Sequence, residues 1–98
     1  MASESDTIIA TLRKEKNYLQ NEFGVVTLGL FGSYARKQEV GESDVDILVE
    51  LRQPRFDWLA GLKLYLEEKL NKKVDLIRKT AHLKKDFLKL IQQDLINV

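Results

Sequence analysis

The sequence predicts a small α+β domain, in which a mixed sheet of about three strands is flanked by helices. Segments with apolar residues at helical spacing alternate with short β-branched or aliphatic runs, in the order helix, strand, strand, helix, strand, helix. A chain of 98 residues has enough apolar residues for one hydrophobic core and no room for a second. Residues 1–98 are therefore expected to form a single domain.

The first helix is expected over Thr7–Phe23, where apolar residues recur at helical spacing. Ser5 or Asp6 is a suitable cap for its start, and Gly24 can end it. The next run, Val25–Phe31, is continuous, largely β-branched or aliphatic, and bounded by glycines. Such a run is typical of a strand that is buried on both faces.

A loop and a second strand follow Gly32. Ser33–Gln38 is expected to lead into a short helix, and Glu39–Ser43 to form a turn. Asp44–Leu51 alternates between two parities, which predicts a strand with one face on the core, and Pro54 closes it. The apolar parity consists of Val45, Ile47, Val49 and Leu51, and the other of Asp44, Asp46, Leu48 and Glu50.

The rest of the chain predicts a helix, a short strand and a final helix. Apolar residues at spacings of three and four from Trp58 onward indicate a helix that starts near Asp57 and ends near Asn71. Val74–Ile77 is expected to be a brief strand. The C-terminal helix is predicted from the amphipathic series Leu83, Phe87, Leu88, Ile91 and Leu95.

Composition excludes several classes of function. Sixteen basic against fifteen acidic residues give a net charge of +1, which offers no electrostatic reason to expect a nucleic acid or an anionic membrane as partner. Without cysteine, and with His82 as the single histidine, a disulfide framework is excluded and a zinc site nearly so. No apolar run approaches spanning length and the first residues lack a signal-peptide pattern, so a cytoplasmic protein is expected.

Asp44 and Asp46 stand two residues apart on a predicted strand, so their side chains project from the same face. Two neighbouring carboxylates repel each other, and a hard divalent cation with oxygen ligands relieves that repulsion. Mg²⁺ is the natural candidate, because one or two carboxylates often hold it together with water and substrate phosphates. An isolated Asp-x-Asp, however, is more often turn or capping chemistry.

The segment from Phe31 to Ser33 predicts a phosphate site, because backbone amides and a hydroxyl meet there at the start of a short helix. Gly32 leaves space for close approach, and Ser33 can donate its hydroxyl to a phosphate oxygen while it caps the helix. Arg36 would add a bidentate charge, although a surface salt bridge is the commoner role for such a residue. A phosphate site beside a metal-holding pair suits nucleoside triphosphate chemistry.

Gly32-Ser33, ten further residues and then Asp44-Val45-Asp46 resemble the signature of the DNA polymerase β-like nucleotidyltransferases. The longer segments 30–36 and 43–49 look like those of minimal nucleotidyltransferases, many of which are MntA-type antitoxins partnered with a HEPN-domain toxin. That family carries a third catalytic carboxylate on a later strand, where this chain has Asp75. After the Ala-Arg pair many members have Gly-Glu, whereas this chain has Lys37-Gln38, which we expect to affect binding more than chemistry.

The resemblance implies a mechanism. Asp44 and Asp46 would hold two Mg²⁺ ions, and Asp75 would complete the second metal site or accept a proton. Gly32 and Ser33 would hold the β- and γ-phosphates of ATP, the implied donor. The implied acceptor is a tyrosine of a HEPN-type toxin, so the reaction would be AMPylation of a protein within a hetero-oligomer. No segment can be assigned to the base.

Two other functions remain open. As a binding module, the chain would silence its partner by complex formation, and the carboxylates would be dispensable. As an enzyme with a small-molecule acceptor such as an aminoglycoside, it would resemble longer nucleotidyltransferases that use a further domain for the acceptor. A chain of 98 residues leaves no room for that domain, so a partner protein is expected to supply the acceptor side.

Overall fold

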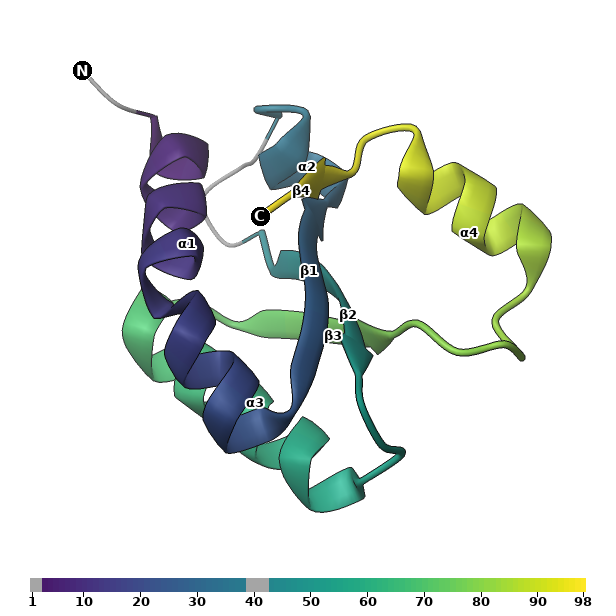
Figure 1. Ribbon diagram of the computed structural model, residues 1–98. Coiled ribbons are helices and arrows are strands. Elements are labelled where there is room, and N and C mark those ends of the chain that lie inside the picture. Colours follow the sequence, from purple (N-terminus) through teal and green to yellow (C-terminus); the bar gives the residue numbers. More distant parts are fainter. Residues whose placement is uncertain (1–2, 39–42) are drawn as a thin grey trace.

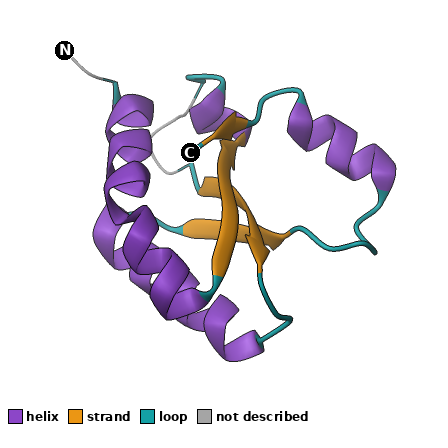
Figure 2. Cartoon of the chain, in the orientation of Figure 1, coloured by secondary structure: helices purple, strands orange, loops and turns teal. Residues whose placement is uncertain are grey.

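The computed structural model describes residues 3–38 and 43–98, which form a four-stranded mixed sheet with helices on both sides (Figure 1 and Figure 2). The predicted α+β class is confirmed, with one strand more than expected. The turn expected over residues 39–43 lies almost wholly outside the described residues. The elements are α1 (Glu4–Phe23), β1 (Val25–Phe31), α2 (Gly32–Ala35), β2 (Val45–Leu51), α3 (Phe56–Leu70), β3 (Val74–Arg78), α4 (Lys85–Gln92) and β4 (Ile96–Asn97).

The strand order in the sheet is β3-β2-β1-β4. β1 pairs antiparallel with both β2 and β4, whereas β2 and β3 run parallel because α3 connects them. In this register Phe31 of β1 lies opposite Asp46, and Asp46 lies opposite Asp75 of β3. The topology thus places the end of β1 beside the carboxylates of two further strands.

The core lies between the sheet and the helices α1 and α3, which pack side by side on one face (Figure 1). As predicted, the apolar parity of β2 faces this core, since Val45, Ile47 and Val49 are fully buried. The prediction that β1 is buried on both faces is wrong at its start, where Val26 and Thr27 are exposed. In the part of the chain that the structure describes, no helix has the length and apolar character needed to cross a membrane.

The C-terminal segment differs from the sequence prediction. α4 ends at Gln92, and Leu95 lies beyond it, next to the short strand β4. The Leu95 side chain packs over Gly29, where a side chain on β1 would collide with it. Leu95 is four residues after Ile91, as in a further helical turn. Its contact with the sheet nevertheless places Leu95 outside the helix.

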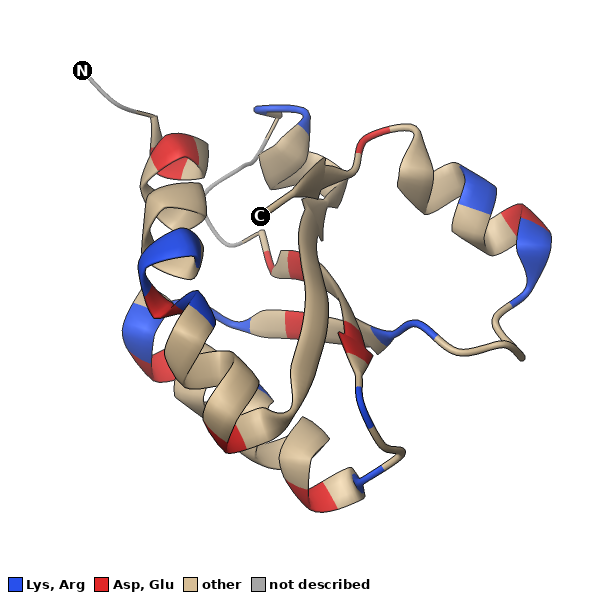
Figure 3. Cartoon of the chain, in the orientation of Figure 1, with Lys and Arg blue, Asp and Glu red and all other residues tan. Residues whose placement is uncertain are grey.

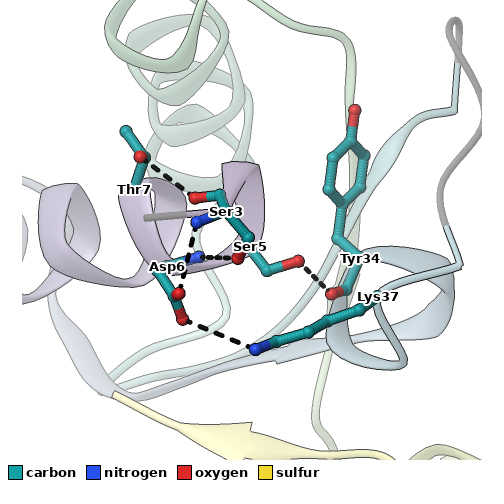
Figure 4. Close-up of polar contacts among 6 residues, drawn as sticks. All are labelled: Ser3, Ser5, Asp6, Thr7, Tyr34 and Lys37. Carbon is teal, nitrogen blue, oxygen red and sulfur yellow. Dashed lines mark hydrogen bonds and ion pairs between the residues drawn. The ribbon is translucent and has the colours of Figure 1, made fainter. Parts of the chain in front are cut away.

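The start of α1 also differs from the prediction. Ser3, not Ser5 or Asp6, is the N-cap: its hydroxyl oxygen accepts from the Asp6 N–H at 3.1 Å, and the Asp6 carboxylate accepts from the Ser3 N–H at 3.3 Å (Figure 4). Ser5 is fully buried, and its hydroxyl donates to the backbone carbonyl of Tyr34 in α2. At the other end, Gly24 terminates α1 in a left-handed conformation, as predicted.

Replacing Ser3 with alanine is expected to lower the free energy of unfolding by about 1 kcal/mol, because the first turn of α1 loses its side-chain acceptor. In a domain of this size, that loss lowers the melting temperature by about 4–8 °C. Ser3→Asp retains an acceptor and is the matched control. Equal melting temperatures for the wild type and Ser3→Ala would contradict the assigned cap.

Candidate active site

The candidate site begins where β1 passes into α2. Gly32 has a φ of +75°, in the left-handed region that favours glycine, and a Cβ at this position would overlap the Oδ2 atom of Asp46. The antiparallel register of β1 and β2 creates this contact, because Phe31 and Asp46 are paired. The predicted phosphate segment and one of the predicted carboxylates are therefore in direct contact.

Asp46 also lies between the other two predicted carboxylates. Asp75 is its partner in the parallel ladder of β2 and β3, and Asp44 immediately precedes β2. Figure 3 shows acidic positions in red on these two neighbouring strands. Asp46 is half-buried, whereas Asp44 and Asp75 are exposed. The three residues thus lie at one end of the sheet, with Asp46 next to both of the others.

The surroundings of Asp46 oppose its ionisation. Burial raises the pKa of this carboxyl above its ordinary value, and the nearby carboxylates of Asp75 and Asp44 raise the pKa further. Among the described residues, the Arg36 guanidinium acts in the opposite direction. A cation bound beside Asp46 would relieve this electrostatic penalty.

The described side chains do not form a complete three-residue metal site. Within residues 3–38 and 43–98, no three His, Cys, Asp or Glu side chains are gathered closely enough to hold a metal ion. Asp46 and its neighbours Asp44 and Asp75 nevertheless offer carboxylate oxygens, which Mg²⁺ prefers, and Mg²⁺ often takes only one or two of them. The residues present fit such an ion when phosphate and water supply the other ligands, and a metal role for Asp44, Asp46 and Asp75 stays a prediction.

Replacing Asp46 with asparagine is expected to raise the melting temperature at neutral pH in the absence of divalent cations. The folded state raises the pKa of Asp46, so its ionised form destabilises the fold at a pH above that pKa, and asparagine removes the charge. As the pH falls through the raised pKa, the wild-type carboxyl takes up a proton and the difference disappears. Thermal melts across an acidic pH series measure this, and a variant that is less stable at neutral pH would contradict it.

α2 starts two residues earlier than a helix capped by Ser33 would. Gly32 is its first residue and Phe31 its N-cap, with no side-chain capping bond, so the prediction that Ser33 caps the helix is wrong. Ser33 lies in the first turn and is half-buried. Its hydroxyl has no hydrogen-bond partner among the described residues, which leaves it available to a phosphate oxygen.

Contacts with α1 hold α2 in position. The hydroxyl of the buried Ser5 bonds to the Tyr34 carbonyl, and the Lys37 ammonium lies 3.9 Å from the Asp6 carboxylate (Figure 4). The Tyr34 side chain is itself 1% exposed and belongs to the core. The predicted phosphate segment is therefore attached to a rigid part of the fold.

Arg36 forms a surface salt bridge, the commoner role weighed for it from the sequence, with a partner that the sequence did not indicate. Its Nη1 atom lies 2.7 Å from Oδ2 of Asp94, and its Nε atom donates to the Gln38 side chain at 3.3 Å. Asp94 is 58 residues away in the chain and follows α4, so no local pattern indicated it. Arg36 lies within electrostatic range of Asp46, but its contacts are with Asp94 and Gln38, and its predicted phosphate role remains untested.

A family model described as polymerase beta, nucleotidyltransferase matches residues 13–97, which include every predicted site residue. The chain belongs to this nucleotidyltransferase family. The family that the Gly-Ser and Asp-x-Asp segments resemble is thus confirmed.

Relatives of this nucleotidyltransferase occur in archaea. A protein from Methanocaldococcus jannaschii, described provisionally as a protein adenylyltransferase, is 43% identical over 90 residues, which cover 89% of this chain and 90% of the relative. The protein adenylyltransferase MntA of Thermococcus cleftensis is 36% identical over 96 residues, 97% of this chain and 93% of the relative. These relatives match this nucleotidyltransferase over nearly their whole length.

Solved structures confirm the nucleotidyltransferase fold. A structure described provisionally as a minimal nucleotidyltransferase superposes with a TM-score of 0.73 at 29% identity, covering 92% of this chain and 95% of that one. A structure of the tri-AMPylated HEPN toxin of Shewanella oneidensis in complex with its MNT antitoxin gives a TM-score of 0.58 at 21% identity, with 96% and 67% covered. At that identity the second likeness concerns the fold alone.

Proposed function

We propose that this nucleotidyltransferase is a protein adenylyltransferase, which transfers AMP from ATP to a tyrosine hydroxyl of a HEPN-type toxin and thereby acts as its antitoxin. The observation that carries the proposal is the contact between Gly32 and Asp46, with Asp75 next to Asp46 in the sheet. The names of the archaeal relatives support adenylyl transfer to a protein. An MNT antitoxin with the same fold occurs in complex with a HEPN toxin, which makes such a toxin the partner that we propose.

Each residue has a distinct task in this proposal. The backbone N–H groups at Gly32 and Ser33, with the Ser33 hydroxyl, bind the terminal phosphates and orient the triphosphate. Asp46 and Asp44 hold the divalent cations, expected to be two Mg²⁺ ions. When bound, Mg²⁺ would neutralise charge on the phosphates and lower the pKa of the acceptor hydroxyl. Asp75 is exposed beside Asp46, in a position to complete the metal site or to accept the proton from that hydroxyl.

The acceptor is expected to come from the partner protein. Asp75 lies on β3, an edge strand of the sheet, and its side chain is exposed. An incoming tyrosine can therefore approach Asp75 from outside without entering the domain. This arrangement supports a hetero-oligomer with the toxin, which we propose together with the cytoplasmic location expected from the sequence.

The test uses ATP labelled at either the α- or the γ-phosphate, with Mg²⁺ and the product of the neighbouring gene as the candidate toxin. Adenylyl transfer places the α-label on the toxin and leaves the γ-label in pyrophosphate, and a tyrosine-to-phenylalanine change in the toxin abolishes labelling. Chelation of Mg²⁺ with EDTA should also abolish it. Transfer of the γ-label would indicate phosphorylation, and neutralisation of the toxin without any label would favour the binding-module function.

A further inference from the structure

A hollow of about 210 Å³ adjoins the candidate site on the side away from Asp75. We call it the α4 hollow. Its walls come from the start of α2 and from one face of α4, which stands apart from α1 and α3 (Figure 1). Its lining includes Gly32, Arg36, Phe87, Leu90, Ile91 and Asp94.

One face of α4 is apolar but only partly covered. Phe87, Leu90 and Ile91 follow one another at helical spacing, and only Ile91 is buried, at 3% exposure. Phe87 is 41% exposed and Leu90 is 62% exposed, although both line the α4 hollow. An aromatic ring and a leucine thus offer a flat apolar surface close to Gly32.

A pair of charged groups adds polar contacts to this surface. The guanidinium of Arg36 and the carboxylate of Asp94 bond at 2.7 Å, and both residues line the α4 hollow. Arg36 supplies N–H donors and Asp94 supplies acceptor oxygens. A flat heterocycle with both donors and acceptors on its edge would match these groups.

The size and position of the α4 hollow favour a nucleobase as its occupant. Whole drug-sized ligands usually occupy pockets of about 300–1,000 Å³, so the α4 hollow suits a fragment such as a nucleobase. Gly32 belongs both to the α4 hollow and to the contact with Asp46. In the strand order β3-β2-β1-β4, α4 leads into β4, so the α4 hollow and Asp75 lie on opposite sides of Asp46.

We propose that the α4 hollow binds the base of the nucleoside triphosphate donor, with its ring stacked on Phe87 and its edge facing Arg36 and Asp94. The inference rests on the proposed function, because the phosphates must then lie at Gly32 and Ser33. The donor occupies the β4 side of Asp46, and the acceptor approaches from the β3 side. Phe87 is thereby assigned to donor binding, which the family signature does not include.

The test measures binding of two probes in the presence of Mg²⁺, ATP and inorganic tripolyphosphate, by calorimetry on the whole chain. Phe87→Ala should weaken ATP binding about tenfold, as expected for the loss of one stacked base, and leave tripolyphosphate binding unchanged. Phe87→Trp should retain ATP binding. Phe56→Ala is the matched control, because Phe56 is an 81% exposed phenylalanine on α3.

The other outcomes separate this inference from the proposed function. Equal weakening of both probes by Phe87→Ala, or no weakening of ATP binding, would overturn the base site while tripolyphosphate binding still supports the phosphate site. If Phe87→Ala weakens only the complex with the toxin, the base site is also overturned, because the α4 hollow is then a protein-docking surface. If the wild type binds neither ATP nor tripolyphosphate, both the base site and the proposed function are overturned.

Discussion

The rate of nucleotidyl transfer is expected to fall about 10²–10³-fold when Asp46 is replaced with asparagine, the loss expected when several kcal/mol of charge stabilisation disappear. Asparagine retains the shape of the side chain but not the charge that attracts a cation. Asp46 is also the carboxylate that contacts Gly32 and pairs with Asp75. Single-turnover transfer of α-labelled AMP at saturating ATP measures the effect.

A matched control for this variant lies at the start of α3. Asp57→Asn makes the same chemical change at an exposed carboxylate, which forms a surface ion pair with Arg55 and accepts hydrogen bonds from backbone N–H groups at the start of α3. This control should transfer AMP at the wild-type rate. If Asp46→Asn also transfers at that rate, Asp46 does not hold a catalytic cation and the proposed mechanism is wrong.

The opposite effects expected for Asp46→Asn on activity and stability strengthen the test. Burial and two neighbouring carboxylates make the charged form of Asp46 unfavourable without a cation, so its removal should stabilise the fold. An inactive but more stable variant excludes unfolding as the reason for lost activity. Such a conflict between charge and stability is typical of sites that bind a charged ligand.

Much of the fold could be predicted because its elements are determined locally. Val25–Phe31 forms β1 with the predicted bounds, and Gly24 ends α1, because a β-branched run and a glycine act within a few residues. β4 was missed because two residues have no periodicity, and Ile96–Asn97 is a strand only through its pairing with β1. The α1 cap was misplaced because Ser5 suits that role equally well by sequence, but burial against α2 engages its hydroxyl instead.

The candidate site likewise contains residues that the sequence could predict and contacts that it could not. The Gly-Ser and Asp-x-Asp segments indicated residues that the sheet brings together, since the register of two adjacent strands places Gly32 beside Asp46. The ion pair of Arg36 and Asp94, and the α4 hollow beside it, depend on where a distant helix packs. Neither has a local signal, which explains why the sequence alone assigned no residue to the base.

Gly32→Ala is expected to lower both stability and activity. An alanine at a φ of +75° costs roughly 1–2 kcal/mol, and its Cβ would overlap the Asp46 carboxylate, which must then move. A displacement of about 1 Å at a reacting centre can reduce the rate about 10²-fold, so we expect at least that loss. Unfolding in urea and single-turnover transfer measure the two effects separately, with the rate expressed per folded molecule.

Gly24→Ala distinguishes a specific effect from general instability. Gly24 has a φ of +63°, and a Cβ there would overlap the Trp58 ring, so the variant suffers the same kind of strain and collision at the opposite end of β1. It should lose stability to a similar degree yet transfer AMP at the wild-type rate per folded molecule. If both variants lose activity equally, the effect of Gly32→Ala is only structural. If only Gly32→Ala loses activity, the space that this glycine leaves beside Asp46 is needed for the reaction.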